Sequence, residues 1–138
     1  MNIARRNIKI FIFAVSTAVL LLVLCSLAYL NNVLLPWDRN EAVKTTLEWS
    51  GTPSLPKDAE ITKLEVTGSA FSRGFKLDFT TSKVNLVDWL ANSNLSNGTT
   101  TESGVTIYEI RPAMNGAEYA KVVVNEQAST VSIEVYWS

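Results

Sequence analysis

The sequence predicts an α+β protein: an N-terminal transmembrane helix followed by a small antiparallel sheet with one helix packed on a face. Three observations lead to this class. Residues 10–30 are almost entirely apolar and contain no charged side chain. Several short stretches after residue 60 alternate apolar with polar side chains, which is typical of strands with one buried face. Residues 82–92 instead repeat apolar side chains at helical spacing, so the expected order is β-β-α-β-β-β, with about five strands.

The apolar run is long enough to cross a bilayer, because roughly 20 residues of helix span the ~30 Å hydrocarbon core. Arg5, Arg6 and Lys9 precede the run, and no Asp or Glu lies among them. Basic residues next to a span stay on the cytoplasmic side. We therefore expect a cytoplasmic N-terminus (residues 1–9), a single-pass anchor in the cytoplasmic (inner) membrane (residues 10–35) and an extracytoplasmic remainder.

Alternative interpretations of the N-terminal segment stay open. A cleaved signal peptide fits the basic start and the Ser-Leu-Ala tripeptide at residues 26–28, which follows the small-x-small rule of cleavage sites. The apolar run continues past this tripeptide, which favours a retained anchor. Cys25 fits a lipoprotein site, although Leu24 stands where such sites have a small residue. The arginine pair at residues 5–6 also fits a twin-arginine signal.

The composition excludes several kinds of chemistry. The chain has no histidine and a single cysteine, Cys25, which lies inside the apolar run. The part after the run therefore has no intrachain disulfide, no thiolate or histidine metal site and no Ser–His or Cys–His nucleophile pair. Its carboxylates are scattered, its six glycines are dispersed and its basic residues are not clustered. We expect no catalytic residue, no cofactor, no metal and no nucleic-acid partner.

Residues 36–59 are interpreted as a connector between the anchor and a folded domain. Pro36 ends any helix that continues from the anchor. Trp37 is a candidate for the headgroup region, where an indole ring is half buried and its N–H is hydrated. The alternative for Trp37 is a place in the core of the outer domain.

A short helix is expected within this connector, at about residues 39–48. Asp38 and Glu41 match a capping box, and Gly51 stands where such a helix would end. A strand is the alternative, because the same stretch contains side chains that favour extended structure, namely Thr45, Thr46 and Trp49.

Residues 60–138 are expected to form the extracytoplasmic α+β domain. A hairpin opens the domain, with strands at residues 60–68 and 75–79 and a turn near Ser69 and Ala70. In each strand the apolar side chains occupy every second position, so one face of the hairpin is predicted to be buried.

A helix follows the hairpin, capped by Ser82 and ending near Asn92. Its predicted apolar face consists of Leu86, Val87, Trp89 and Leu90. Residues 92–104 are so polar that we expect a mobile loop there. The remaining strands are placed at residues 105–110, 118–125 and 129–137.

These patterns predict one hydrophobic core. It combines the apolar positions of the second strand, the helix and the last strand, with Trp89 or Trp137 at its margin. The predicted core residues are Phe75, Leu77, Phe79, Leu86, Leu90, Val131, Ile133 and Val135.

Tyr108 and Tyr136 are the candidate binding residues. Both are expected on the sheet face opposite most aliphatic side chains of their strands, and exposed aromatic residues on a rigid sheet are favoured in protein interfaces. The alternative for Tyr108 is a second small core that it shares with Ile110.

Two classes of function remain. The first is a membrane-anchored extracytoplasmic interaction module, such as an accessory subunit or an immunity-type inhibitor, without catalytic activity. Its partners are the lipid bilayer and a protein of the envelope or membrane. The second is a binding domain for a small envelope ligand such as a lipid or glycan fragment, which needs a concave apolar pocket.

Overall fold

The computed structural model describes the backbone of residues 2–69 and 71–138 and the side chains of residues 7–69 and 71–138. The side chains of Arg5 and Arg6, which carry the orientation argument, lie outside the described residues. Ala70, expected at the hairpin turn, lies outside them entirely. The chain divides into two compact units, Met1–Val33 and Leu34–Ser138.

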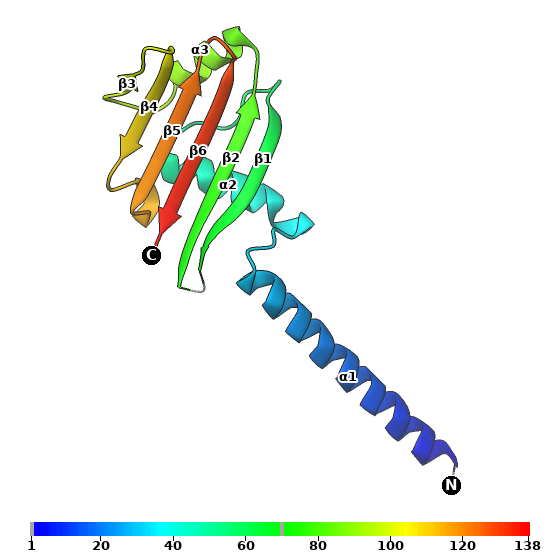
Figure 1. Cartoon of the computed structure of the whole chain (residues 1–138). Coiled ribbons are helices and arrows are strands. Elements are labelled where there is room, and N and C mark those ends of the chain that lie inside the picture. The colour runs from blue at the N-terminus through cyan, green and yellow to red at the C-terminus, as the bar shows by residue number, and fades with distance from the viewer. Residues whose placement is uncertain (1, 70) are drawn as a thin grey trace. The chain divides into compact units, whose positions relative to one another are not determined.

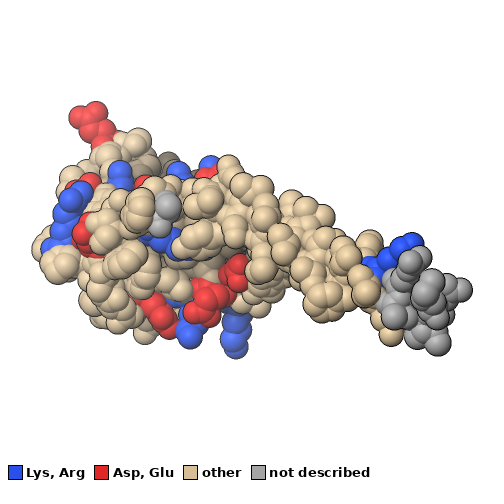
Figure 2. Space-filling model, turned by 90° about the horizontal axis from the view of Figure 1, so that it is seen from below, with Lys and Arg blue, Asp and Glu red and all other residues tan. Residues whose placement is uncertain are grey.

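The first unit contains α1 (Asn2–Leu30). Its apolar part, Asn7–Leu30, has a mean hydropathy of 2.8 and is not buried against protein. Figure 2 shows its flank without charge except near the N-terminal end. The hydroxyls of Thr17 and Ser26 donate to the carbonyls of Phe13 and Leu22, at 2.9 and 2.8 Å, so these polar groups need no water. By length and composition α1 fits a membrane anchor, and a signal sequence has the same properties.

The second unit is built on a six-stranded antiparallel sheet with the strand order β1-β2-β6-β5-β4-β3 (Figure 1). The C-terminal strand β6 lies between β2 and β5, so hydrogen bonds tie the first hairpin to the last one. The strands are β1 (Glu60–Ser69), β2 (Ser72–Thr80), β3 (Thr99–Thr100), β4 (Val105–Ile110), β5 (Tyr119–Asn125) and β6 (Thr130–Trp137).

The sixth strand corrects the predicted strand count and order. β3 lies in the stretch that we expected to be a loop, and its residues Thr99 and Thr100 pair with Ile107 and Thr106. The hydroxyls of Thr100 and Thr106 lie 3.1 Å apart. Threonine is polar yet favours extended backbone, which explains why a search for apolar alternation missed this strand.

The helical segments are η1 (Pro36–Asp38), α2 (Arg39–Ser50), α3 (Lys83–Ala91) and η2 (Met114–Gly116). Figure 1 shows α2 and α3 behind the same face of the sheet, so two helices cover this face where one was predicted. On the inner side of α2 lie the buried small residues Ala42, Thr46 and Ser50. Their spacing of four residues puts them on one line, along which the helix can approach the sheet closely.

The polar members of this line are satisfied within α2. The Thr46 hydroxyl donates to the Ala42 carbonyl at 2.7 Å, and the Ser50 hydroxyl donates to the Leu47 carbonyl at 3.1 Å. Burying a hydroxyl without a partner is costly, so these bonds are what allow Thr46 and Ser50 to face the core. The Trp49 ring adds a contact with the sheet, at 5.9 Å from the Phe75 ring between centroids.

The predicted helix ends are partly confirmed. Gly51 has a left-handed conformation (φ 68°) and caps the C-terminus of α2, and the Ser82 side chain caps α3 by accepting from the Asn85 backbone N–H. The capping box is wrong: in the described residues the Asp38 side chain accepts no capping hydrogen bond. The chain enters α2 from η1, so Asp38 already has helical dihedrals instead of the extended ones of an N-cap.

The core confirms most of the predicted residues and changes others. Trp89 is only 4% exposed, and its ring meets Phe79 edge-on at 5.5 Å. Trp137 is 47% exposed and Val87 is 52% exposed, so neither belongs to the core. Leu90 is half-buried. The two fully buried residues of the short α3 are Leu86 and Trp89. The core also includes residues that were not predicted, namely Ala42, Leu47, Val66, Ala120, Val122 and Val124.

Candidate functional site

The strand register separates two faces of the sheet. One cross-strand row contains Tyr108, Val122, Ile133 and Leu77, and the helices cover this side, here named the covered face. The rows between belong to the opposite side, here named the open face, which no helix of the described part of Leu34–Ser138 covers in Figure 1. Because side chains alternate along each strand, every residue of a row shares its face.

A row of alternating charges crosses the open face. From β4 to β1 its members are Glu109, Lys121, Glu134, Lys76 and Glu65, each opposite the next in the register. Adjacent strands lie about 4.8 Å apart, so each of the three inner charges has a charge of opposite sign on both sides, which stabilises the sheet modestly. We name this set the charge row.

Two tyrosines lie next to the charge row. Tyr119 and Tyr136 are direct cross-strand partners, and Gly74 continues their row on β2. A Cβ at Gly74 would clash with the Thr67 hydroxyl and would lie 2.7 Å from the Val135 carbonyl and 3.5 Å from the Tyr136 ring. The absent side chain therefore leaves room for Thr67 and the Tyr136 ring over β2.

Arg111 completes this aromatic group, because its guanidinium carbon lies 4.4 Å above the centre of the Tyr119 ring. Burial raises the pKa of the Tyr119 phenol, and the negative charges of Glu109 and Glu134 add to this effect. The phenol therefore stays neutral and can both donate and accept a hydrogen bond. Aromatic and arginine side chains of this kind are enriched among the residues that dominate protein interfaces.

The structure places the two predicted binding residues on opposite faces. Tyr136 is half-buried on the open face, as expected. The expected position of Tyr108 is wrong: it pairs with Val122 and packs against the core together with Ile110. Its strand carries aliphatic side chains at both parities, for example Ile107 and Ile110, so the alternation alone does not identify the buried face.

Tyr119 and Arg111 were missed by the sequence analysis. The predicted strands at residues 118–125 and 129–137 held the signal for Tyr119, since pairing them as a hairpin brings Tyr119 opposite Tyr136. Arg111 follows the end of β4, and nothing in the spacing of the sequence links it to a residue of β5.

Trp37, the predicted headgroup residue, belongs to η1 and is 73% exposed. Its alternative place in the core of the outer domain is therefore wrong. The exposed ring is compatible with contact to lipid headgroups, which stays a prediction.

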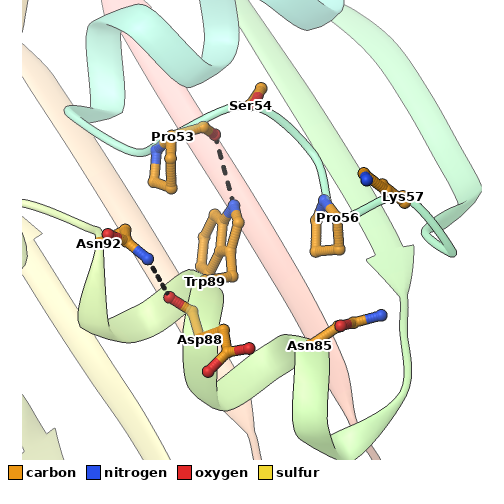
Figure 3. Close-up of a pocket in the computed structure, with 8 residues that line it drawn as sticks. All are labelled: Pro53, Ser54, Pro56, Lys57, Asn85, Asp88, Trp89 and Asn92. Atoms are coloured by element: carbon orange, nitrogen blue, oxygen red, sulfur yellow. Dashed lines mark hydrogen bonds between the residues drawn. The ribbon is translucent and has the colours of Figure 1, made fainter.

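A pocket of about 550 Å³ lies between α3 and the proline-containing segment before β1 (Figure 3). The Trp89 ring lies between Pro53 and Pro56, and its indole N–H donates to the Pro53 carbonyl at 3.3 Å. Polar side chains complete the lining, namely Ser54, Lys57, Asn85, Asp88 and Asn92. Since Trp89 is buried, the pocket offers a ligand mainly these polar groups and the proline rings.

Asp58 fastens the same segment to the start of α3. Its carboxylate accepts from the Thr81 hydroxyl at 2.5 Å and from the Ser82 backbone N–H at 3.0 Å. The Thr81 hydroxyl, followed by Ser82 and Asn85, holds the pKa of this carboxyl well below its usual range. The charged form of Asp58 therefore stabilises this wall of the pocket.

No known protein family, curated protein or solved structure matches this chain. The open face, the pocket and α1 are therefore the features that indicate a function.

Proposed function

We propose that this protein is a single-pass membrane protein whose extracytoplasmic domain is a non-catalytic protein-interaction module. The observation that carries the proposal is the open face: an aromatic group beside a charge row, on a sheet whose other face packs against α2 and α3. A covered face supplies the stability of the domain, and an open one on a rigid sheet is available for a partner.

The tyrosines give this surface its expected affinity. Tyr119 and Tyr136 are neighbours on central strands, and Arg111 stacks on one of them. Such side chains combine a large apolar surface with a polar end at low cost in conformational entropy, which is why they are favoured in interfaces. The charge row beside them fixes orientation, because a partner must match its alternating signs.

The proposed anchor is α1. Its apolar part rises about 36 Å over 24 residues, which exceeds the ~30 Å of a bilayer core. We propose that its basic N-terminal end stays in the cytoplasm and that Leu34–Ser138 lie outside the cytoplasmic membrane. The intact mass of protein extracted from membranes tests retention of the anchor. A mature N-terminus at Tyr29, after the tripeptide at residues 26–28, would show cleavage and contradict this part.

The interaction role is tested by photocrosslinking from the open face. A photoreactive phenylalanine analogue replaces Val123, which is half-buried on this face next to Ser132. Irradiation of cells should give a discrete crosslinked product that contains a second protein. The control places the same analogue at Val84, which is 72% exposed on α3 in the helix layer. Absence of a product at Val123, or equal products at both positions, would contradict an interaction surface here.

The second candidate function is binding of a small envelope ligand such as a lipid or glycan fragment. The pocket beside Trp89 favours it, since its volume is within the range of small-molecule sites. Asn85, Asp88 and Asn92 supply hydrogen-bonding groups of the kind that sugars require. Loss of ligand binding in Asn85→Ala, with retained folding, would support this function, and unchanged binding would contradict it.

A further inference from the structure

We infer that the open face pairs with the open face of a second copy of this chain. The inference rests on the proposed function, because it names the partner of the surface described there. Its basis is that the charge row is complementary to itself about a twofold axis parallel to the strands, and that the tyrosines favour an axis between β5 and β6.

Stacked sheets align their strands within about 30° and lie about 10 Å apart. A twofold axis parallel to the strands and between β5 and β6 places β5 over β6 of the second copy, and β4 over its β2. Lys121 then faces Glu134 of the second copy, and Glu109 faces Lys76 of the second copy. Symmetry repeats both contacts, so four pairs of opposite charge form and no like charges meet.

The competing twofold arrangement is disfavoured by the same residues. An axis perpendicular to the strands, in the plane between the sheets and through the charge row, stacks each strand on its own counterpart. Glu134 would then face Glu134 of the second copy, and Lys121 would face Lys121. Juxtaposed like charges are unfavourable in an interface, so the charge row favours an axis parallel to the strands.

The tyrosines decide which two strands flank the axis. An axis between β2 and β6 would also pair opposite charges, but it would place Tyr136 over Gly74 of the second copy. With the axis between β5 and β6, Tyr119 lies over Tyr136 of the second copy, and Tyr136 lies over its Tyr119. Four aromatic rings therefore gather around the axis, two residues along the strands from the charged contacts. Central aromatic clusters flanked by polar groups are the usual organisation of an interface.

The size of the overlap is that of a weak dimer. In this arrangement four long strands overlap, because β1 lies over the two-residue β3 of the second copy. At about 4.8 Å spacing and about 23 Å length they give roughly 440 Å² per copy, or about 880 Å² in total, which is typical of weak or transient interfaces. The proposed anchor strengthens the association, because two chains in one membrane meet at a high effective concentration.

Charge-swap variants of the full chain test the inference. Two differently tagged copies are coexpressed, and their copurification from detergent extracts is measured. Lys121→Glu and Glu134→Lys should each reduce self-association about tenfold or more, because like charges then meet across the axis. Mixing the Lys121→Glu copy with the Glu134→Lys copy restores opposite signs in every such contact, so copurification should return toward the wild-type level.

The mixture separates contact between copies from effects within one sheet. Lys121 and Glu134 are also neighbours in the same sheet, and each variant keeps this internal repulsion whether it is alone or mixed. Lys83→Glu, on α3 in the helix layer, is the matched control and should leave copurification unchanged. Recovery in the mixture therefore reports the contact between two copies. The inference would be overturned if Lys121→Glu and Glu134→Lys left self-association unchanged. It would also be overturned if the mixture copurified no more strongly than each variant does with itself.

The crosslink from Val123 distinguishes failure of this inference from failure of the proposed function. A product with twice the mass of the chain supports pairing of two copies. A product of another mass overturns self-pairing but keeps the open face as an interaction surface. No product overturns both.

Discussion

The two faces of the sheet obey the same alternation along the strands but differ in what they hold. On the covered face Leu77, Val122 and Ile133 are completely buried beneath the helices. On the open face their neighbours along the strands are the charges of the charge row, which keep contact with solvent. The comparison teaches that residues for stability and residues for recognition alternate along each strand. Mutation of two adjacent residues should therefore affect different properties, either the stability of the domain or its association with a partner.

The largest contrast is expected on β2. Phe79→Ala removes a fully buried ring that contacts Trp89, and it should lower the free energy of unfolding by about 3–5 kcal/mol. Lys76 lies on the open face of the same strand, and Lys76→Ala should change the free energy of unfolding by less than about 0.5 kcal/mol. Denaturant unfolding of the detergent-solubilised full chain, followed by circular dichroism, measures both. Equal losses would break the division between the faces.

The next largest effect concerns α2, which lies within the predicted connector. Leu47 is buried against the core, so Leu47→Ala should lower the free energy of unfolding by about 2–5 kcal/mol. Lys44→Ala, at an exposed position of the same helix, is the control and should have almost no effect. If Leu47→Ala were as mild as Lys44→Ala, α2 would be a linker that contributes nothing to the covered face.

How far the sequence predicted this fold depended on whether a buried face was visibly apolar. The strands around Phe75, Leu77 and Ile133 were predicted because apolar and polar residues alternate strictly there. The inner line of α2 was hidden, since Thr46 and Ser50 are polar and become suitable for burial only through hydrogen bonds within the helix.

The candidate site was harder to predict, because it depends on pairing between strands. Tyr136 follows buried valines and isoleucine in strict alternation, so its face was predicted correctly. Tyr108 lies in a strand with aliphatic residues on both faces, and only the register with Val122 assigns its side. The charge row is likewise scattered through the sequence and exists only after five strands are aligned.

A smaller effect is expected at the end of α2. Gly51 has a positive φ of 68°, and a Cβ there would lie 3.3 Å from the Met114 side chain. Gly51→Ala should therefore lower the free energy of unfolding by about 1–2 kcal/mol. Gly116→Ala is a useful comparison, because its φ is also positive but a Cβ would meet nothing within 4 Å. If Gly51→Ala lowers the free energy of unfolding more than Gly116→Ala does, the difference between the two variants is due to packing of Gly51 against η2.

The pH dependence sharpens the account of the pocket wall. The pKa of Asp58 is lower in the folded state, so its contribution to stability is present above the unfolded pKa of about 3.9 and is lost as the pH falls below it. Asp58→Asn should therefore lower stability near neutral pH and flatten its fall between about pH 4 and pH 2. Unfolding midpoints of both proteins across this range measure the effect. Parallel curves would contradict a stabilising carboxylate at this position.

A small effect on stability, and the most informative one, is expected for Tyr136→Ala. Its ring is half-buried on the open face, so truncation should cost about 1 kcal/mol or less. The same substitution should strongly reduce copurification of two tagged copies, whereas the wild-type chain associates.

The most direct test of the division between the two faces measures unfolding and self-association in Tyr136→Ala and in the wild type. We predict nearly unchanged unfolding together with lost association. A loss of stability as large as that of Phe79→Ala would place Tyr136 in the structural core, and unchanged association would remove it from the interface; either result would contradict the account.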